Sequence, residues 1–160
     1  MARDALRREV PGRRFEMPPA QNKKIVQRML DAFNSGNMEL VDRVVSKDHV
    51  DETPFPGTPA NRDGLKKQIA ALREAFPDAK FSVEKITAQG DTVAFRWKMV
   101  GTNRGPFMGQ RATNKQVTQF GTDFVTIRDG LIVAHDSSKN MGDLLAKLGL
   151  PADTIRELIP

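Results

Sequence analysis

Residues 115–127 read KQVTQFGTDFVTI and are followed by Arg128-Asp129-Gly130. This stretch is rich in β-branched and aromatic residues, which predicts a β-strand, and Asp-Gly is typical of the tight turn in a β-hairpin. Asp123 is the only charged side chain in residues 116–127. A carboxylate in such surroundings is costly unless a partner or a reaction uses it, and desolvation is expected to raise its pKa towards that of a general base. Asp123 is therefore the first candidate for a catalytic residue. The alternative is a structural carboxylate that bonds to backbone or hydroxyl groups or lies at a wet rim.

The turn also predicts what lies opposite Asp123. If Asp129 and Gly130 form a two-residue loop, Asp123 faces Asp136 on the neighbouring strand, with their Cβ atoms about 5 Å apart. Two carboxylates at that distance in a partly dry site cannot both ionise freely, so one would serve as a base and the other as an acid. This register leaves His135 on the outer face or at the rim. A shift of one residue would break the pair and bring His135 onto the inner face instead.

Length and composition limit the classes of function. The 160 residues suit one domain. The chain has no Cys, and its only histidines are His49 and His135, so disulfides, a thiol nucleophile and a three-histidine zinc site are excluded. It also lacks the P-loop, GxGxxG and GxSxG motifs, and no metal or cofactor is expected. No signal peptide or membrane-spanning stretch is recognisable, which predicts a cytoplasmic protein without membrane contact.

The net charge of +5 comes mostly from one end of the chain. Residues 1–24 contain seven Lys or Arg and three Asp or Glu, so the rest is nearly neutral. We expect residues 1–21 to form a basic, proline-containing arm and residues 22–160 to form a single domain, which should fold without residues 1–18. Nucleic-acid binding is not expected, because no basic stripe with interleaved aromatic residues follows the arm.

Hydrophobic periodicity gives the order of the elements. Helical spacing is found first, then a proline-rich loop over residues 51–61, and then a period of two. Helices are predicted over 23–33, from a cap at Asn37, over 63–76 and from about 140; strands are predicted over 79–88, 92–101, 115–127 and 131–137. Helices followed by consecutive antiparallel strands predict an α+β domain, in which the helices cover one face of a curved sheet. The concavity between them would receive a small molecule.

Four segments of the chain carry a family resemblance. They are NKKIVQRMLDAFNSGNMELVDRVV (22–45), AFPDAKFSVEKITAQGDTVAFRW (75–97), GTNRGPFMGQRATNKQVTQFGTDFVTIRDGLIV (101–133) and LLAKLGLP (144–151). In this order they resemble the SnoaL-like polyketide cyclase (ester cyclase) family of the nuclear transport factor 2-like superfamily. The resemblance implies a cone-shaped, curved antiparallel sheet wrapped around N-terminal helices, an apolar pocket, no cofactor and a homodimer formed through the outer surface of the sheet. It also implies that Asp123 removes a proton α to carbonyls before an intramolecular aldol condensation.

Some positions differ from the family pattern and define further candidates. Asn103 and Glu52 stand where relatives often carry histidine, Asp136 replaces a frequent Trp, and Asn140 replaces an Asp. Glu52, Asn103 and Asn140 are expected to bind substrate. Trp97, as a pocket wall, and His135 complete the predicted substrate-binding set.

The leading hypothesis is a cofactor-independent cyclase or isomerase for a small hydrophobic carbonyl or polyketide-like substrate, with Asp123 as base and Asp136 as proton donor. Two alternatives stay open. A limonene epoxide hydrolase-like reaction would use the Asp pair and Arg96 to activate water, although alternation places Arg96 opposite to Trp97. The other alternative is a non-catalytic module that binds a small molecule or forms dimers, because this fold is found in many such proteins. A carboxylate deep in a cavity would favour catalysis.

Overall fold

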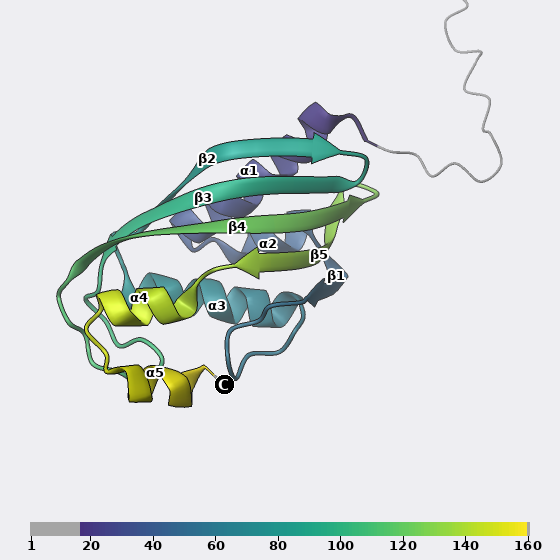
Figure 1. Cartoon of the computed structure of the whole chain (residues 1–160). Helices are drawn as coiled ribbons and strands as arrows, with labels where there is room; N and C mark the ends of the chain where they lie inside the picture. The colour runs from purple at the N-terminus through teal and green to yellow at the C-terminus, as the bar shows by residue number, and fades with distance from the viewer. Residues whose placement is uncertain (1–16, 160) are drawn as a thin grey trace, which may run out of the picture.

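Five helices and five strands make up residues 17–159, the part of the chain that the computed structural model describes (Figure 1). The helices are α1 (Pro19–Ser35), α2 (Met38–Val44), α3 (Arg62–Ala75), α4 (Met141–Lys147) and α5 (Ala152–Leu158). The strands are β1 (Val45–Asp51), β2 (Lys80–Gln89), β3 (Thr92–Thr102), β4 (Gln116–Arg128) and β5 (Leu131–Ser138). The predicted α+β class is confirmed.

The strands form one curved sheet in the order β1-β5-β4-β3-β2. Neighbours from β2 to β5 are antiparallel, whereas β1 runs parallel to β5. The sheet is therefore mixed, and the prediction of a purely antiparallel sheet is wrong at this edge. β1 is not predicted from the sequence, because the segment Val45–Asp51 follows α2 without a turn residue and carries several polar side chains.

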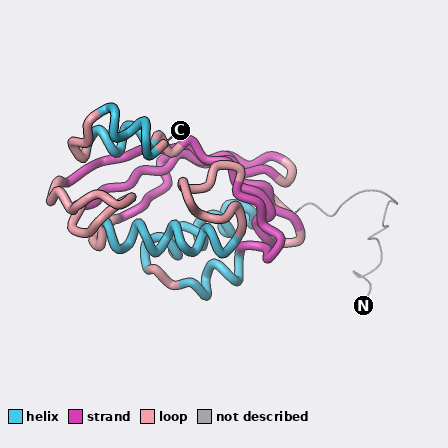
Figure 2. Tube along the Cα trace, turned by 90° about the horizontal axis from the view of Figure 1, so that it is seen from below, coloured by secondary structure: helices cyan, strands magenta, loops and turns pink. Residues whose placement is uncertain are grey.

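The helices α1, α2 and α3 lie on one side of the sheet, as Figures 1 and 2 show from two directions. Their apolar residues recur at helical spacing and face the inner side of the sheet. The core they build is fully buried, for example at Val26, Leu65, Ile69, Val93 and Phe95. Burial of each such side chain contributes about 1.5–3 kcal/mol. One end of this layer, next to α4, stays partly open and holds the pocket described below.

Local signals set where the helices begin. Asn37 caps α2, because its side chain accepts a hydrogen bond from the backbone NH of Glu39 at 3.0 Å, as predicted. Asn61 caps α3 in the same way. α1 begins at Pro19, four residues before the predicted start, and α5 was not predicted. Residues 1–16 of the predicted arm lie outside the described part of the chain.

The outer face of the sheet carries two exposed aromatic side chains. Phe124 is 52% exposed and Phe120 is 39% exposed, both on β4, and the guanidinium of Arg96 lies 4.8 Å from the ring centroid of Phe120. Val50 at the β1 edge is 53% exposed. Exposed aromatic residues on a sheet face are typical of interaction surfaces. None of the helices in residues 17–159 has both the length and the apolar character needed to cross a bilayer.

Candidate active site

A β-bulge in the β4–β5 hairpin decides which side chains meet. Asp129 and Gly130 both have positive φ, 52° and 78°, as the predicted two-residue turn requires. Pairing begins in the expected register with Ile127 opposite Ile132, but the next pair joins Thr126 to Ala134. Val133 has no partner in the ladder, so it is the extra residue of a bulge. Every residue of β5 beyond Val133 is therefore shifted by one position relative to β4.

The shift separates the predicted pair of aspartates. Asp123 lies opposite Ser137, whereas Asp136 lies opposite Phe124 and is exposed on the outer face. The prediction that Asp123 and Asp136 face each other is wrong, because the bulge exchanges the two faces of β5. For the same reason the prediction of His135 on the outer face or rim is wrong. His135 is buried on the inner face, as the alternative register required.

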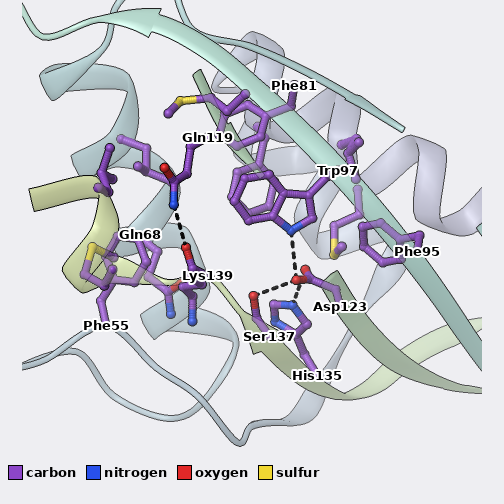
Figure 3. Close-up of a pocket in the computed structure, with 17 residues that line it drawn as sticks. Phe55, Gln68, Phe81, Phe95, Trp97, Gln119, Asp123, His135, Ser137 and Lys139 are labelled. Atoms are coloured by element: carbon purple, nitrogen blue, oxygen red, sulfur yellow. Dashed lines mark hydrogen bonds and ion pairs between the residues drawn. The ribbon is translucent and has the colours of Figure 1, made fainter. Parts of the chain in front are cut away.

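Asp123 is held by three side chains from the two strands that flank β4 (Figure 3). Its Oδ1 accepts hydrogen bonds from the indole Nε1 of Trp97 at 2.9 Å and from the hydroxyl of Ser137 at 2.6 Å. Its Oδ2 lies 2.7 Å from Nε2 of His135. Asp123 is only 6% exposed. The carboxylate is thus fixed in position and its charge is compensated by donors, as a buried carboxylate requires.

Gly121 makes the contact between Trp97 and Asp123 possible. Trp97 and Gly121 are direct partners across β3 and β4, and the indole lies over the glycine. A Cβ atom at position 121 would come within 2.2 Å of Cζ2 of Trp97. A residue with a side chain would therefore displace the indole that donates to Asp123.

The partners of Asp123 determine the direction of its pKa. Burial acts to raise the pKa, but the hydrogen bond and charge of His135, with the hydrogen bonds from Ser137 and Trp97, outweigh burial and lower it below the usual range. The prediction of a raised pKa is therefore wrong. Asp123 is ionised at neutral pH, and its environment favours the carboxylate form.

The pocket that Asp123 lines has an open space of about 650 Å³, part of which is continuous with solvent. Its walls are mostly apolar and include the aromatic side chains Phe33, Phe55, Phe81, Phe95 and Trp97. The polar side chains that line it are Gln68, Gln119, Asp123, His135, Ser137 and Lys139. An apolar cavity with a few convergent polar groups is typical of a site for a small organic molecule.

Strand β1 places two further buried polar residues next to this pocket. Asp51 is 2% exposed and accepts hydrogen bonds from Nε2 of Gln68 at 2.8 Å and from the NH of Thr53 at 2.9 Å. The ring of His49 stacks against that of His135, with centroids 6.3 Å apart. Burial, together with the charge of His135, lowers the pKa of His49 to about 4. These residues were missed because β1 was missed; their signal is the spacing of two between His49 and Asp51, which puts both on one face of a strand.

A comparison with protein-family models matches residues 23–148 to the SnoaL-like polyketide cyclase model. The chain belongs to the SnoaL-like polyketide cyclase family. Family membership supports an enzyme of the cyclase or isomerase class. Among functionally curated proteins, none is significantly similar to the chain.

Solved structures show the same fold. IdmH from Streptomyces antibioticus, described as a proposed polyketide cyclase, is 30% identical over 81% of this chain and 99% of its own, with a TM-score of 0.71. AclR from Streptomyces galilaeus, described as a proposed hydroxylase, is 29% identical over 84% and 100%, with a TM-score of 0.73. TsrD from Streptomyces laurentii is 21% identical over 84% and 98%, with a TM-score of 0.77, and shows similarity of fold alone.

Not all predicted site residues of this SnoaL-like protein lie at the pocket. Trp97 and His135 line it beside Asp123. Glu52 is exposed, and its contact with β5 is a backbone hydrogen bond to the carbonyl of His135. Asn103 is buried, and its side chain stabilises a loop. Its Nδ2 donates to the carbonyl of Gly105, and its Oδ1 accepts from the NH of Thr113. These two predicted substrate-binding residues are not among the residues that line the pocket.

Asn140 is likewise outside the lining, because its side chain caps α4. Arg96 is exposed on the outer face, as alternation predicted. With Asp136 also on that face, the two groups that an epoxide hydrolase-like reaction would add to Asp123 do not reach the pocket. In residues 17–159 no three His, Asp or Glu side chains are grouped as ligands of a metal ion.

Proposed function

We propose that this SnoaL-like protein is a cofactor-independent cyclase or isomerase of a small hydrophobic carbonyl compound, in which Asp123 is the general base. The observation that carries the proposal is the setting of Asp123, a buried carboxylate that lines an apolar pocket and is fixed by three side-chain contacts. Family membership supports the reaction class. A carboxylate buried within a cavity favours catalysis over binding alone.

The lowered pKa of Asp123 narrows the substrate class. A base must be deprotonated to act, and Asp123 meets this condition at neutral pH. A carboxylate of low pKa is, however, a weak base, so proton transfer to it is feasible only from a strongly acidified carbon. A carbon between two carbonyl groups is such a carbon acid. The proposed substrate therefore carries a 1,3-dicarbonyl unit attached to an apolar body that fits among the aromatic walls.

The reaction would proceed in two proton transfers. Asp123 takes the proton from the central carbon, and the electron pair of the broken C–H bond moves into an enolate. In an isomerisation the proton returns at another atom. In a cyclisation the enolate carbon attacks a second carbonyl of the same molecule, a C–C bond forms, and the new alkoxide takes its proton from Asp123. Both routes return Asp123 to its starting form.

The proposal includes a cytoplasmic homodimer formed through the outer face of the sheet. Phe120 and Phe124 supply exposed apolar area on that face. Two copies that pair there would bury these rings while the pocket, on the opposite side of the sheet, stays accessible.

Hydrogen–deuterium exchange tests the function without knowledge of the natural substrate. The probe is ethyl benzoylacetate, an aromatic β-keto ester, and the exchange of its central CH₂ protons in D₂O is followed by ¹H NMR. Wild-type protein is expected to accelerate the exchange, and Asp123→Asn to reduce the acceleration roughly 100-fold or more, as the loss of a general base does. Asp136→Asn is the matched control, because it makes the same change on the outer face.

Binding is measured separately through the fluorescence of Trp97, the only tryptophan of the chain. If wild type and Asp123→Asn bind the ester but exchange its protons at the same rate, the protein is a binding module and the proposal is refuted. Thermal unfolding of Asp123→Asn shows whether its fold is kept.

A further inference from the structure

Lys139 is the only Lys or Arg among the residues that line the pocket. It follows the last residue of β5, and its ammonium group donates a hydrogen bond to the carbonyl of Thr53. The ammonium nitrogen also lies 5.3 Å from the ring centroid of Phe55. An ammonium group has three donors, and the structure assigns a protein acceptor to one of them. The other two are available to a molecule in the pocket.

The backbone at Lys139 is fixed by a buried amide. Nε2 of Gln119, which is 2% exposed, donates to the carbonyl of Lys139 at 3.2 Å and to that of Asn140 at 3.3 Å. Oε1 of Gln119 in turn accepts from Lys147 at 3.0 Å. Lys139 therefore leaves the strand at a defined point, and its position is not that of a freely moving surface lysine.

The surroundings of Lys139 make its charge effective. The ammonium is partly buried among apolar walls, where Coulomb interactions are stronger than in water. Burial lowers the pKa of Lys139, and the charges of Asp51, Asp123 and Asp136 act against that effect. Asp51 and Asp123 are buried near the pocket, and the sheet separates Asp136 from it. Figure 3 shows that the side chains of Lys139 and Asp123 both line the same pocket.

We propose that Lys139 binds the oxygen on which negative charge develops when Asp123 removes a proton from the substrate. This inference rests on the proposed function and adds to it the group that stabilises the enolate. The atoms that hold Asp123, namely Nε1 of Trp97, the hydroxyl of Ser137 and Nε2 of His135, already serve the carboxylate. Lys139 thus complements Asp123: one group accepts the proton from carbon, and the other holds the carbonyl oxygen of the adjacent atom.

Asp123 and Lys139 have different roles when the C–H bond of the substrate breaks. As the C–H bond breaks, its electron pair forms the C=C bond of the enolate, and the carbonyl π pair moves to the oxygen. The proton passes to the carboxylate of Asp123, whose negative charge disappears as that of the enolate oxygen appears. Lys139 keeps its proton and donates a charge-assisted hydrogen bond to the oxygen. The total charge of the pocket does not change.

The test uses benzoylacetone, an aromatic 1,3-diketone whose enolate and neutral forms have different ultraviolet spectra. The fraction of bound enolate is measured against pH with wild type, Lys139→Met, Lys139→Arg and the control Lys67→Met. Lys67 is an exposed lysine on α3 that does not line the pocket. Wild type is expected to shift the diketone towards enolate, and Lys139→Met to lower the enolate-to-neutral ratio roughly 10-fold or more, the value of a hydrogen bond to a charged group. Lys139→Arg should retain most of the shift and Lys67→Met all of it.

The proposal is overturned if wild type does not enrich the enolate, or if Lys139→Met enriches it as strongly as wild type does. A structural lysine would change thermal stability without changing the spectrum of the bound diketone. The spectrum reports the equilibrium between bound enolate and bound neutral diketone, whereas the exchange experiment reports the rate of proton removal. If the enolate shift needs Lys139 but wild type does not accelerate proton exchange, the proposed function alone is refuted. If wild type accelerates exchange and Lys139→Met changes neither the exchange rate nor the spectrum of the bound diketone, the role of Lys139 alone is refuted.

Discussion

His49 should make the protein less stable as the pH falls below neutrality. This histidine is 2% exposed, and neither of its ring nitrogens has a hydrogen-bond partner among the described residues. Burial is the main cause that lowers its pKa from 6.5 to about 4; the charge of His135 acts in the same direction, and Asp51 acts against it. The folded protein therefore keeps His49 neutral at a pH where the unfolded chain already binds a proton there.

The sign and size of the effect follow from these two pKa values. Above pH 6.5 neither state protonates His49, so the residue contributes no pH dependence. Between 6.5 and about 4 the unfolded state gains a proton that the folded state does not, and the free energy of unfolding decreases as the pH falls. From about pH 7.5 to about pH 5 the decrease amounts to about 2 kcal/mol. Carboxylates with lowered pKa, such as Asp123, lose their contribution only at more acidic pH.

Urea denaturation at about pH 7.5 and about pH 5 measures this difference, with the fluorescence of Trp97 as the signal. In His49→Leu the decrease should be smaller than in wild type by about 2 kcal/mol, because the group that causes it is gone. Asp48→Asn, a change at the exposed preceding residue, should keep the wild-type decrease. Equal stability of wild type at both pH values, or a decrease of the same size in His49→Leu, would refute the reasoning.

Three further predictions concern other parts of the molecule. Gly121→Ala should displace the indole of Trp97 from Asp123, because its Cβ would lie 2.2 Å from Cζ2; a loss of about 1–3 kcal/mol in unfolding free energy and a shifted tryptophan emission are expected. Phe124→Asp, at a side chain that is 52% exposed, should convert the proposed dimer to a monomer in analytical ultracentrifugation without lowering thermal stability; a monomeric wild type would contradict the dimer. Removal of residues 1–18 should lower the midpoint of thermal unfolding only slightly, because α1 begins at Pro19 and the deletion costs the domain only the packing of Met17 and the carbonyl of Pro18, which accepts hydrogen bonds from Gln21 and Asn22. A large decrease in the midpoint would show that the arm belongs to the folded domain.

Much of the fold could be predicted because its signals are local. The helical spacing in α1 and α3, the cap at Asn37 and the turn at Asp129-Gly130 each lie within a few residues of the element they define. β1 could not be predicted in this way. Its seven residues are mostly polar and pair in parallel with β5, which is far away in sequence, so tertiary pairing rather than local preference makes it a strand.

Three of the predicted site residues line the pocket, namely Asp123, Trp97 and His135, although His135 was expected on the outer face or at the rim. Asp123 and Trp97 were found because a charge in an apolar strand and an aromatic residue in an alternating strand are visible in the sequence. Lys139 was missed because it lies beyond the end of β5, where alternation no longer predicts direction. The direction of the pKa shift of Asp123 was missed for a different reason. Burial can be guessed from sequence, but the donors that outweigh it come from two other strands and depend on register.

The unpaired residue Val133 therefore determines the chemistry of the pocket. Without the bulge, Asp136 on β5 would face Asp123. Two carboxylates that close do not both ionise freely, so the pair would keep one proton between them. With the bulge, β5 presents His135 and Ser137, whose contacts hold Asp123 in its ionised form. The same hairpin sequence thus yields either a partly protonated acid pair or a single carboxylate base, and one extra residue in the ladder selects the second. While Asp123 accepts the proton from carbon, it cannot also donate a hydrogen bond to the developing oxyanion. That task falls to another group that lines the pocket, and Lys139 is placed to perform it.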